Sequence, residues 1–282
     1  VIHAHDWITY PAAIRLSQAT GKPIIAHIHS TEFDRSGELV NPAVYSIEQR
    51  GMMHAARVVA VSNRTRDFVV QRYGIPAERV DVIHNGIDLP AADASVRPQT
   101  RTGDPTVLFL GRVTMQKGPQ YFVEAARRVV AEIPRARFVM AGSGDLLPTV
   151  RNMVRESGLA DRFDLPGFLR GEAVQDAYRN ADVYVMPSVS EPFGLTALEA
   201  AGLGTPVILS KSSGVAEVLK RGALPVDFWD TRLMARLICA LLRCPGLAEH
   251  LSREGMEEVK RLTWDAAADL CLAVYHSQAP AA

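Results

Sequence analysis

Hydrophobic positions along the chain follow two alternating patterns. Short apolar runs, typical of buried strands, are separated by longer segments in which apolar residues recur about every three to four positions, as in amphipathic helices. In the first part of the chain we predict strands at 1–4, 23–29, 57–61 and 80–83, with helices at 11–20, 42–55 and 62–73. Strands that alternate with helices predict a parallel sheet in an α/β domain.

The pattern breaks off and then resumes. Residues 89–105 are rich in Ala, Asp, Ser, Thr, Arg and Pro without a period, so we interpret them as an interdomain linker. Beyond them we predict strands at 106–110, 137–141, 161–164, 183–186 and 206–209, helices at 119–131, 146–157, 172–180 and 195–202, and a helical tail from Asp230. The predicted parts are 1–90, 91–263, and a C-terminal helix and tail at 264–282.

The amino-acid composition argues against nucleic-acid binding and against membrane-spanning segments. The 31 basic and 31 acidic residues give a formal net charge of zero, so there is no electrostatic case for nucleic acid. No apolar run approaches the roughly 20 residues that span a bilayer. Cys239, Cys244 and Cys271 lack metal-ligand spacing, and we interpret them as reduced thiols of a cytoplasmic protein.

The N-terminus begins directly inside a predicted strand. Val1 has no Met, polar lead-in or signal peptide before it. We therefore expect a further N-terminal segment and an incomplete first domain.

The stretch from Glu191 to Ala201 organises the candidate chemistry. Glu191 lies in a predicted loop, Gly194 in a turn, and Glu199 on a helix that begins at Leu195. Unpaired N–H groups at a helix start suit a phosphate, and carboxylates accept hydrogen bonds from sugar hydroxyls. Solvated surface glutamates are the plainer alternative. The apolar surroundings of Glu199 instead predict a buried partner, and the stretch predicts a pocket for a nucleotide-activated sugar.

A family resemblance rests on the whole string, which reads Glu191-Pro-Phe-Gly-Leu-Thr-Ala-Leu-Glu199. It resembles the signature of retaining glycosyltransferases of family 4. The resemblance implies the GT-B fold, with two facing Rossmann-like domains and a cleft between them. It also implies transfer of a sugar from a nucleoside-diphosphate sugar to an acceptor hydroxyl, with retention of anomeric configuration and without a cofactor or metal.

The resemblance also assigns roles to these residues. Glu199 would hold the ribose hydroxyls, and Glu191 would hold the transferred sugar together with the backbone of Phe193, Gly194 and Leu195. The acceptor would be a carbohydrate or a lipid-linked molecule.

A basic pair follows the strand predicted at 106–110. Arg112 and Lys117 stand in the segment Gly111-Arg-Val-Thr-Met-Gln-Lys-Gly118, at the strand edge where α/β sheets bind ligands. Two solvated basic residues are the alternative. The segment resembles the family element whose basic pair holds the diphosphate, and Arg112 and Lys117 would then stabilise the leaving group in place of a metal ion.

Two further loops follow strands. Ala141-Gly142-Ser-Gly144 lacks the third glycine of a dinucleotide fingerprint, and a tight turn alone explains its glycines. Small residues at Gly142 would also let a nucleotide approach the backbone. The loop that contains Phe168 and Leu169 resembles the family's base-contacting loop, in which backbone groups meet the base.

Two His-x-His pairs occur in the first part of the chain. His3 and His5 share one face of a strand, as do His27 and His29. One alternative is a metal-dependent hydrolase that uses both pairs, and another is that one His of each pair belongs to the core. In the family resemblance His29 meets the transferred sugar near the reaction centre, and Asp6 touches acceptor or sugar hydroxyls.

Two expectations concern the rest of the molecule. The family's glycine-rich loop near the N-terminus has no counterpart from Val1 onward, so a non-catalytic nucleotide-sugar binder is a third alternative. A lipid-linked acceptor would bring the protein to the inner face of the membrane through a basic patch. Its candidate residues are Arg50, Arg57, Arg64 and Arg66, for which we favour a solvated helix face.

Overall fold

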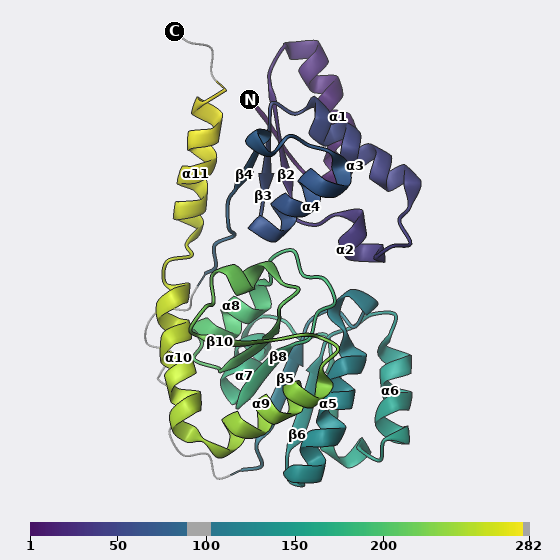
Figure 1. Ribbon diagram of the computed structural model, residues 1–282, viewed down its shortest axis with the longest axis vertical. Coiled ribbons are helices and arrows are strands. Elements are labelled where there is room, and N and C mark those ends of the chain that lie inside the picture. The colour runs from purple at the N-terminus through teal and green to yellow at the C-terminus, as the bar shows by residue number, and fades with distance from the viewer. Residues whose placement is uncertain (89–102, 279–282) are drawn as a thin grey trace. The chain divides into compact units, whose positions relative to one another are not determined.

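The structure is a computed structural model that describes residues 1–88 and 103–278 (Figure 1). The chain divides into two compact units. Unit 1 comprises Val1–Gly86 and Leu262–Ala282, and unit 2 comprises Ile87–Arg261. Most of the linker predicted at 89–105 lies outside the described residues.

Unit 1 contains, among its described residues, a four-stranded parallel sheet. The strands, in spatial order, are β1 (Ile2–His5), β2 (Ile24–Ile28), β3 (Arg57–Ala60) and β4 (Val80–Val82). Helices on this sheet are α1 (Asp6–Thr20), α2 (Glu32–Ser36), α3 (Pro42–His54), α4 (Asn63–Tyr73) and α11 (Trp264–His276). The alternation of strand and helix predicted from the sequence is confirmed here.

The two faces of this sheet pack against different helices. Ala26 and Val58 belong to a core cluster with residues of α1, α3 and α4. Ile25 and Val59 point the opposite way and pack against Val274 of α11. The last helix of the chain therefore covers the face of the sheet that the first helices leave open.

Unit 2 contains a six-stranded parallel sheet in the order β10-β9-β8-β5-β6-β7 among its described residues. The strands are β5 (Thr106–Leu110), β6 (Arg137–Ala141), β7 (Phe163–Gly167), β8 (Val183–Met186), β9 (Val207–Ser210) and β10 (Ala223–Val226). The helices are α5 (Pro119–Glu132), α6 (Leu147–Glu156), α7 (Glu172–Asn180), α8 (Leu195–Gly202), α9 (Thr231–Arg243) and α10 (Pro245–Val259). This is the doubly wound Rossmann order, which reverses between β5 and β8.

Apart from shifts of one residue at an end, four elements differ from the sequence prediction. The strand predicted at 161–164 is β7, which spans Phe163–Gly167. α1 begins at Asp6 and carries Pro11 inside it, so our reading of Pro11 as the first helical residue was wrong. α2 was missed although Thr31 and Asp34 form a capping box, a pattern readable in Thr31-Glu-Phe-Asp34. β10 was also missed. It contains Pro225, which is tolerated in a strand at the sheet edge, where β10 lies.

Candidate functional site

The candidate site of unit 2 lies where its strand order reverses. The loop after β5 and the loop after β8 leave neighbouring strands at their carboxyl ends. Parallel α/β sheets bind ligands at this switch point. Gln116 O accepts a hydrogen bond from Val189 N at 2.9 Å, which fastens the two loops together.

Lys117 and Glu191 meet across these loops. The Lys117 Nζ forms an ion pair with Glu191 Oε2, although 74 positions separate the residues. Glu191 is only 6% exposed, and Ser188 Oγ also donates to its carboxylate at 3.4 Å. A buried carboxylate needs such partners. The structure therefore brings together two residues that the sequence placed in separate motifs.

Arg112 lies on the same loop as Lys117. It is exposed, and its Nη2 donates to Gln116 Oε1 at 2.9 Å. Sequence reasoning missed Gln116, whose side chain orients Arg112 and whose backbone joins the loops. In the sequence, only its position directly before Lys117 could have indicated that Gln116 belongs to the site.

The start of α8 completes this group. Phe193 is buried, and its carbonyl accepts from Val215 N at 2.7 Å, which fixes the loop before the helix. Gly194 has φ 117°, and a Cβ there would come within 3.0 Å of Met186 Cε. The first turn from Leu195 has no side-chain cap among the described residues. Its backbone N–H groups suit an anion.

Glu199 has a buried partner, as predicted. Tyr178 of α7, which is 1% exposed, donates its hydroxyl to Glu199 Oε2 at 2.8 Å. Burial raises the pKa of Glu199, and the Tyr178 hydrogen bond opposes that shift. Burial also raises the pKa of Tyr184, and both Glu191 and Glu199 add to that rise.

We call Arg112, Lys117, Glu191, Glu199 and the first turn of α8 the lysine–glutamate site. Basic side chains and helix N–H groups lie together with two carboxylates at one sheet edge. Such a set can bind an anion and accept hydrogen bonds from hydroxyl groups.

The neighbouring loops interlock through glycines. Gly111 N donates to Ala141 O at 3.0 Å, and Gly142 N donates to Gly167 O at 2.7 Å. Gly142 has φ 144°, and a Cβ there would overlap Gly111 O. Loop packing by itself therefore requires Gly142; the approach of a nucleotide stays a prediction.

Phe168 and Leu169 follow β7. Phe168 is 64% exposed, and the Arg170 guanidinium lies 5.3 Å from the centroid of its ring. Leu169 is half-buried. These residues follow the strand that pairs with β6, and their contact with a base stays a prediction.

The His-x-His pairs of unit 1 do come together. His5 and His27 are register partners of β1 and β2, so their side chains share a face with His3 and His29. His3 Nε2 lies 3.2 Å from His27 Nδ1, and His5 Nδ1 lies 2.9 Å from His29 Nε2. We call these four residues the histidine cluster. Sequence reasoning missed Tyr275 of α11, whose hydroxyl bonds His3 Nδ1.

Burial keeps much of the histidine cluster neutral. Desolvation, with neighbouring imidazoles, lowers the pKa of His3 to about 4 and that of His27 to about 2. Burial also lowers the pKa of His29, although Asp6 opposes the shift. His3 and His27 therefore behave as uncharged donors and acceptors at neutral pH.

Asp6 positions the loop that follows β2. It has φ 56°, uncommon for a residue other than glycine. Its Oδ1 accepts from His29 N at 2.8 Å and from Ser30 N at 3.4 Å. Asp6 therefore holds the backbone of His29, in addition to any contact with a substrate hydroxyl.

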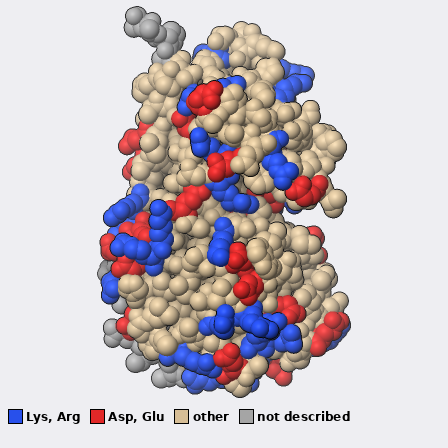
Figure 2. Space-filling model, viewed as in Figure 1, with Lys and Arg blue, Asp and Glu red and all other residues tan. Residues whose placement is uncertain are grey.

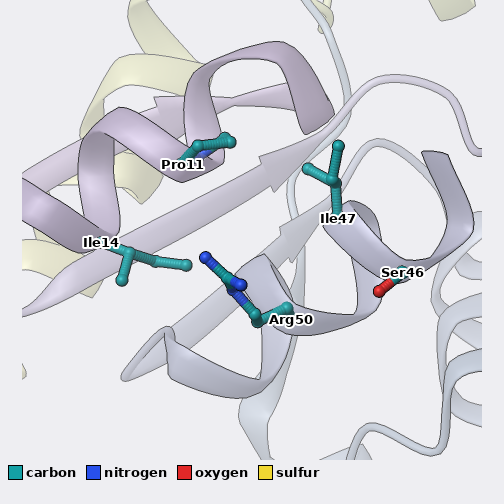
Figure 3. A pocket seen from close by; sticks show the side chains of 5 residues that line it. All are labelled: Pro11, Ile14, Ser46, Ile47 and Arg50. Atoms are coloured by element: carbon teal, nitrogen blue, oxygen red, sulfur yellow. The ribbon is translucent and has the colours of Figure 1, made fainter. Parts of the chain in front are cut away.

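Other surface features do not coincide with either group. A pocket of about 80 Å³ lies between α1 and α3, lined by Pro11, Ile14, Ser46, Ile47 and Arg50 (Figure 3). Ligand pockets usually occupy at least about 300 Å³, so this one is too small for a nucleotide sugar. Basic and acidic side chains are interspersed on the face that Figure 2 shows, in keeping with zero net charge. In the described part of the chain, every helix is too short or too polar to cross a membrane.

Comparisons with known proteins agree with this architecture. The family model described as glycosyl transferases group 1 matches residues 93–258, and that of glycosyltransferase family 4 matches residues 1–90. The uncharacterized glycosyltransferase MJ1607 of Methanocaldococcus jannaschii is 30% identical over 98% of this chain and 74% of its own length.

Solved structures are similar over nearly the whole chain. Sucrose-phosphate synthase from Thermosynechococcus elongatus has a TM-score of 0.83 and 26% identity, over 98% of this chain and 73% of its own. Anabaena HepE in complex with UDP-glucose also has a TM-score of 0.83, with 18% identity, over 98% of this chain and 78% of its own. The chain belongs to the group 1 glycosyl transferases and is a glycosyltransferase of the family 4 type with the GT-B fold.

Proposed function

We propose that the protein moves a sugar from a nucleoside-diphosphate sugar to an acceptor hydroxyl with retention of anomeric configuration. The observation that carries this proposal is the Lys117–Glu191 ion pair at the β5/β8 switch point, beside the uncapped start of α8. A cation and helix N–H groups suit the diphosphate, and the carboxylate suits a sugar hydroxyl.

The leaving group is the first chemical requirement. Cleavage of the glycosidic bond leaves negative charge on the diphosphate, and positioned cations stabilise that charge in the transition state. Arg112, Lys117 and the first turn of α8 supply such stabilisation without a metal ion. Glu191 holds Lys117 in place through this ion pair, so the diphosphate competes with that carboxylate for the ammonium group.

Orientation of the donor is the second requirement. Glu199 accepts hydrogen bonds from the ribose hydroxyls, and the hydrogen bond from the Tyr178 hydroxyl holds its carboxylate in place. Glu191 and the backbone of Phe193, Gly194 and Leu195 hold the transferred sugar. Backbone groups of Phe168 and Leu169 meet the base, and Gly142 lets the nucleotide approach the sheet edge.

Unit 1 serves the acceptor. His29 contacts the transferred sugar near the reaction centre, and Asp6 orients His29 through its backbone N–H. Asp6 also offers its carboxylate to an acceptor or sugar hydroxyl. We assign no protein nucleophile. The acceptor is a carbohydrate or a lipid-linked molecule.

The setting of the reaction is part of the proposal. We propose a cytoplasmic protein, with a lipid-linked acceptor drawing it to the inner face of the membrane. The arginines suggested for that contact have other partners. Arg57 donates to Asp81 at 2.9 and 2.6 Å, and Arg66 lies 3.7 Å from Asp67. These ion pairs favour a solvated surface over a lipid-binding patch.

Family membership favours the transferase over the metal-dependent hydrolase. A non-catalytic nucleotide-sugar binder would bind the same donor as the transferase but would not transfer the sugar. Calorimetry with a nucleotide sugar, run beside a transfer assay, separates these two.

The test uses labelled UDP-glucose first, because HepE was crystallised with it. The wild type, Lys117→Ala, Arg112→Ala and the control Lys211→Ala are compared for hydrolysis and transfer. Lys211 is an exposed lysine paired with Asp227 at 2.9 Å, so its loss should leave activity unchanged. We expect Lys117→Ala to lower the rate about 100-fold or more, since a lost oxyanion-type donor costs this much.

Equal rates in Lys117→Ala, Arg112→Ala and the control would remove the assignment of the lysine–glutamate site. The anomeric configuration of the product, read by proton NMR, tests retention separately. Inversion would overturn that part of the proposal.

A further inference from the structure

The histidine cluster holds an imidazole that the proposed transfer leaves unexplained. His27 is 7% exposed, and its Nε2 is buried without a hydrogen-bond partner in residues 1–88 and 103–278. His27 Nδ1 is already engaged by His3 Nε2. Whichever of these two nitrogens carries the proton, His27 Nε2 remains a buried group with unused bonding capacity. Buried polar atoms normally have a partner.

The nitrogens of the cluster converge. One nitrogen from each of His3, His5 and His27 lies within 4.8 Å of the other two. The shorter separations are 3.2 Å between His3 and His27 and 2.9 Å between His5 and His29. Two nitrogens that bind one tetrahedral ion at 2.0–2.1 Å are about 3.3 Å apart. The separation of His3 Nε2 and His27 Nδ1 is already close to this value.

The positions of the rings are set by the fold. β1 and β2 place the histidines in register on one face of the sheet. Tyr275 contacts His3 Nδ1 from α11, which leaves Nε2 directed at His27. Metal-binding histidines usually have such a partner on their second nitrogen, because it fixes the ring and the tautomer.

We propose that His3, His5 and His27 bind a divalent transition-metal ion, with Zn²⁺ the best fit. Neutral imidazole is the ligand form, and it suits Zn²⁺, Cu²⁺ and Ni²⁺. Asp6, which accepts a hydrogen bond from the backbone N–H of His29 at 2.8 Å, adds a nearby carboxylate.

The experiment measures metal binding alone, so its outcome does not depend on whether the protein transfers a sugar. Untagged protein is stripped with a chelator, dialysed and titrated with Zn²⁺ by calorimetry near pH 7.5, and Co²⁺ is added in parallel for its visible absorption. We expect one ion per chain and a tetrahedral Co²⁺ spectrum. His27→Gln should weaken Zn²⁺ binding at least tenfold.

The matched control is His54→Gln. His54 is exposed at the end of α3, with its Nδ1 bonded to Arg50 O at 2.8 Å, and its loss should leave Zn²⁺ binding unchanged. Because His27 is buried, His3→Gln repeats the test at a less buried position, and circular dichroism checks folding. Absence of Zn²⁺ binding by the wild type, or equal Zn²⁺ affinity in His3→Gln and His54→Gln, would overturn the site.

Discussion

The lysine–glutamate site of unit 2 and the histidine cluster of unit 1 both hold polar groups out of water, but by different means. In unit 2 unlike groups meet, since Lys117 pairs with Glu191 and Tyr178 donates to Glu199. In unit 1 like groups meet, since the stacked rings of His27 and His29 have centroids 4.3 Å apart. Opposite charges can remain ionised together, whereas adjacent imidazoles favour the neutral state.

The two sites therefore differ in how their charge is set: the lysine–glutamate site is always charged, whereas the charge of the histidine cluster depends on what it binds. Unit 2 keeps cations and helix N–H groups fixed by interlocked loops, which suits charge that develops during a reaction. The charge of the histidine cluster depends on protons and, under our proposal, on metal. Substitutions that change loop geometry, ion pairing or imidazole burial should each alter this contrast.

Gly142→Ala should have the largest effect. Its Cβ would overlap Gly111 O, and its φ of 144° is strained for alanine, so the interlocked loops cannot keep their positions. We expect the free energy of unfolding of unit 2 to fall by about 4 kcal/mol, the range of severe backbone and packing defects. Urea denaturation followed by circular dichroism measures the change.

Gly158→Ala is the matched control for that experiment. Gly158 has φ 67°, but a methyl group added there would meet no atom within 4 Å, so only backbone strain is added. A loss of about 1–2 kcal/mol is expected. Equal losses in the two variants would show that strain, rather than contact between the loops, sets the requirement for Gly142.

Glu191→Gln comes next in size. The amide keeps the shape of the side chain but cannot neutralise Lys117 or offer a charged acceptor to a sugar hydroxyl. We expect transfer to fall about 10- to 100-fold, because a hydrogen bond to a charged group contributes about 1.5–3 kcal/mol. Steady-state kinetics with the labelled donor measures this.

The control for Glu191→Gln is Glu257→Gln. Glu257 also pairs with a lysine, Lys260, but on the exposed surface of α10, where ion pairs contribute little. Its transfer rate should match the wild type. A similar loss in both variants would mean that the effect of Glu191→Gln is not specific to the site.

The histidine cluster should make unit 1 sensitive to acid. The pKa values of His3 and His27 are lowered, to about 4 and about 2, so below pH 6.5 the unfolded chain binds more protons than the folded one. Stability is therefore full above pH 6.5 and falls as the pH drops toward 4. Each such group contributes at most about 1.4 kcal/mol per pH unit.

Tryptophan fluorescence can measure this in unit 1. With Trp229→Phe, an exposed change in unit 2, the remaining tryptophans are Trp7 and Trp264, both in unit 1. Urea midpoints at pH 7.5, 5.5 and 4.5 should decline less steeply in His3→Gln than in His54→Gln. Parallel declines would contradict a role for His3 in the acid response.

Local pattern was sufficient to predict most elements, because periodicity and turn residues act over short distances. β5, β6, α7, β8 and α8 agree with the predicted bounds. The apolar neighbours of Glu199 in the sequence were enough to predict that its carboxylate has a buried partner. They could not show that this partner is Tyr178, because α7 and α8 meet only through tertiary packing.

Contacts between residues far apart in the sequence could not be predicted. Nothing near His3 indicates that Tyr275, 272 positions away, covers it. Likewise Gly142 was predicted to serve a turn or a nucleotide, and its contact with the Gly111 carbonyl appears only when β5 and β6 are paired. Asp6 was assigned to hydroxyl groups, while its bond to His29 N depends on the pairing of β1 with β2.

Phe168→Ala should have the smallest effect and tests how unit 2 reads the base. Phe168 is 64% exposed, and the Arg170 guanidinium lies over its ring, so stability should change by less than about 0.5 kcal/mol. If backbone groups of Phe168 and Leu169 meet the base, the calorimetric affinity for UDP should also stay within about twofold of the wild type. A tenfold loss of UDP affinity would instead mean that the ring stacks on the base, since aromatic stacking contributes about 1–3 kcal/mol. Unit 2 would then recognise its donor through an exposed, movable side chain as well as through fixed loops.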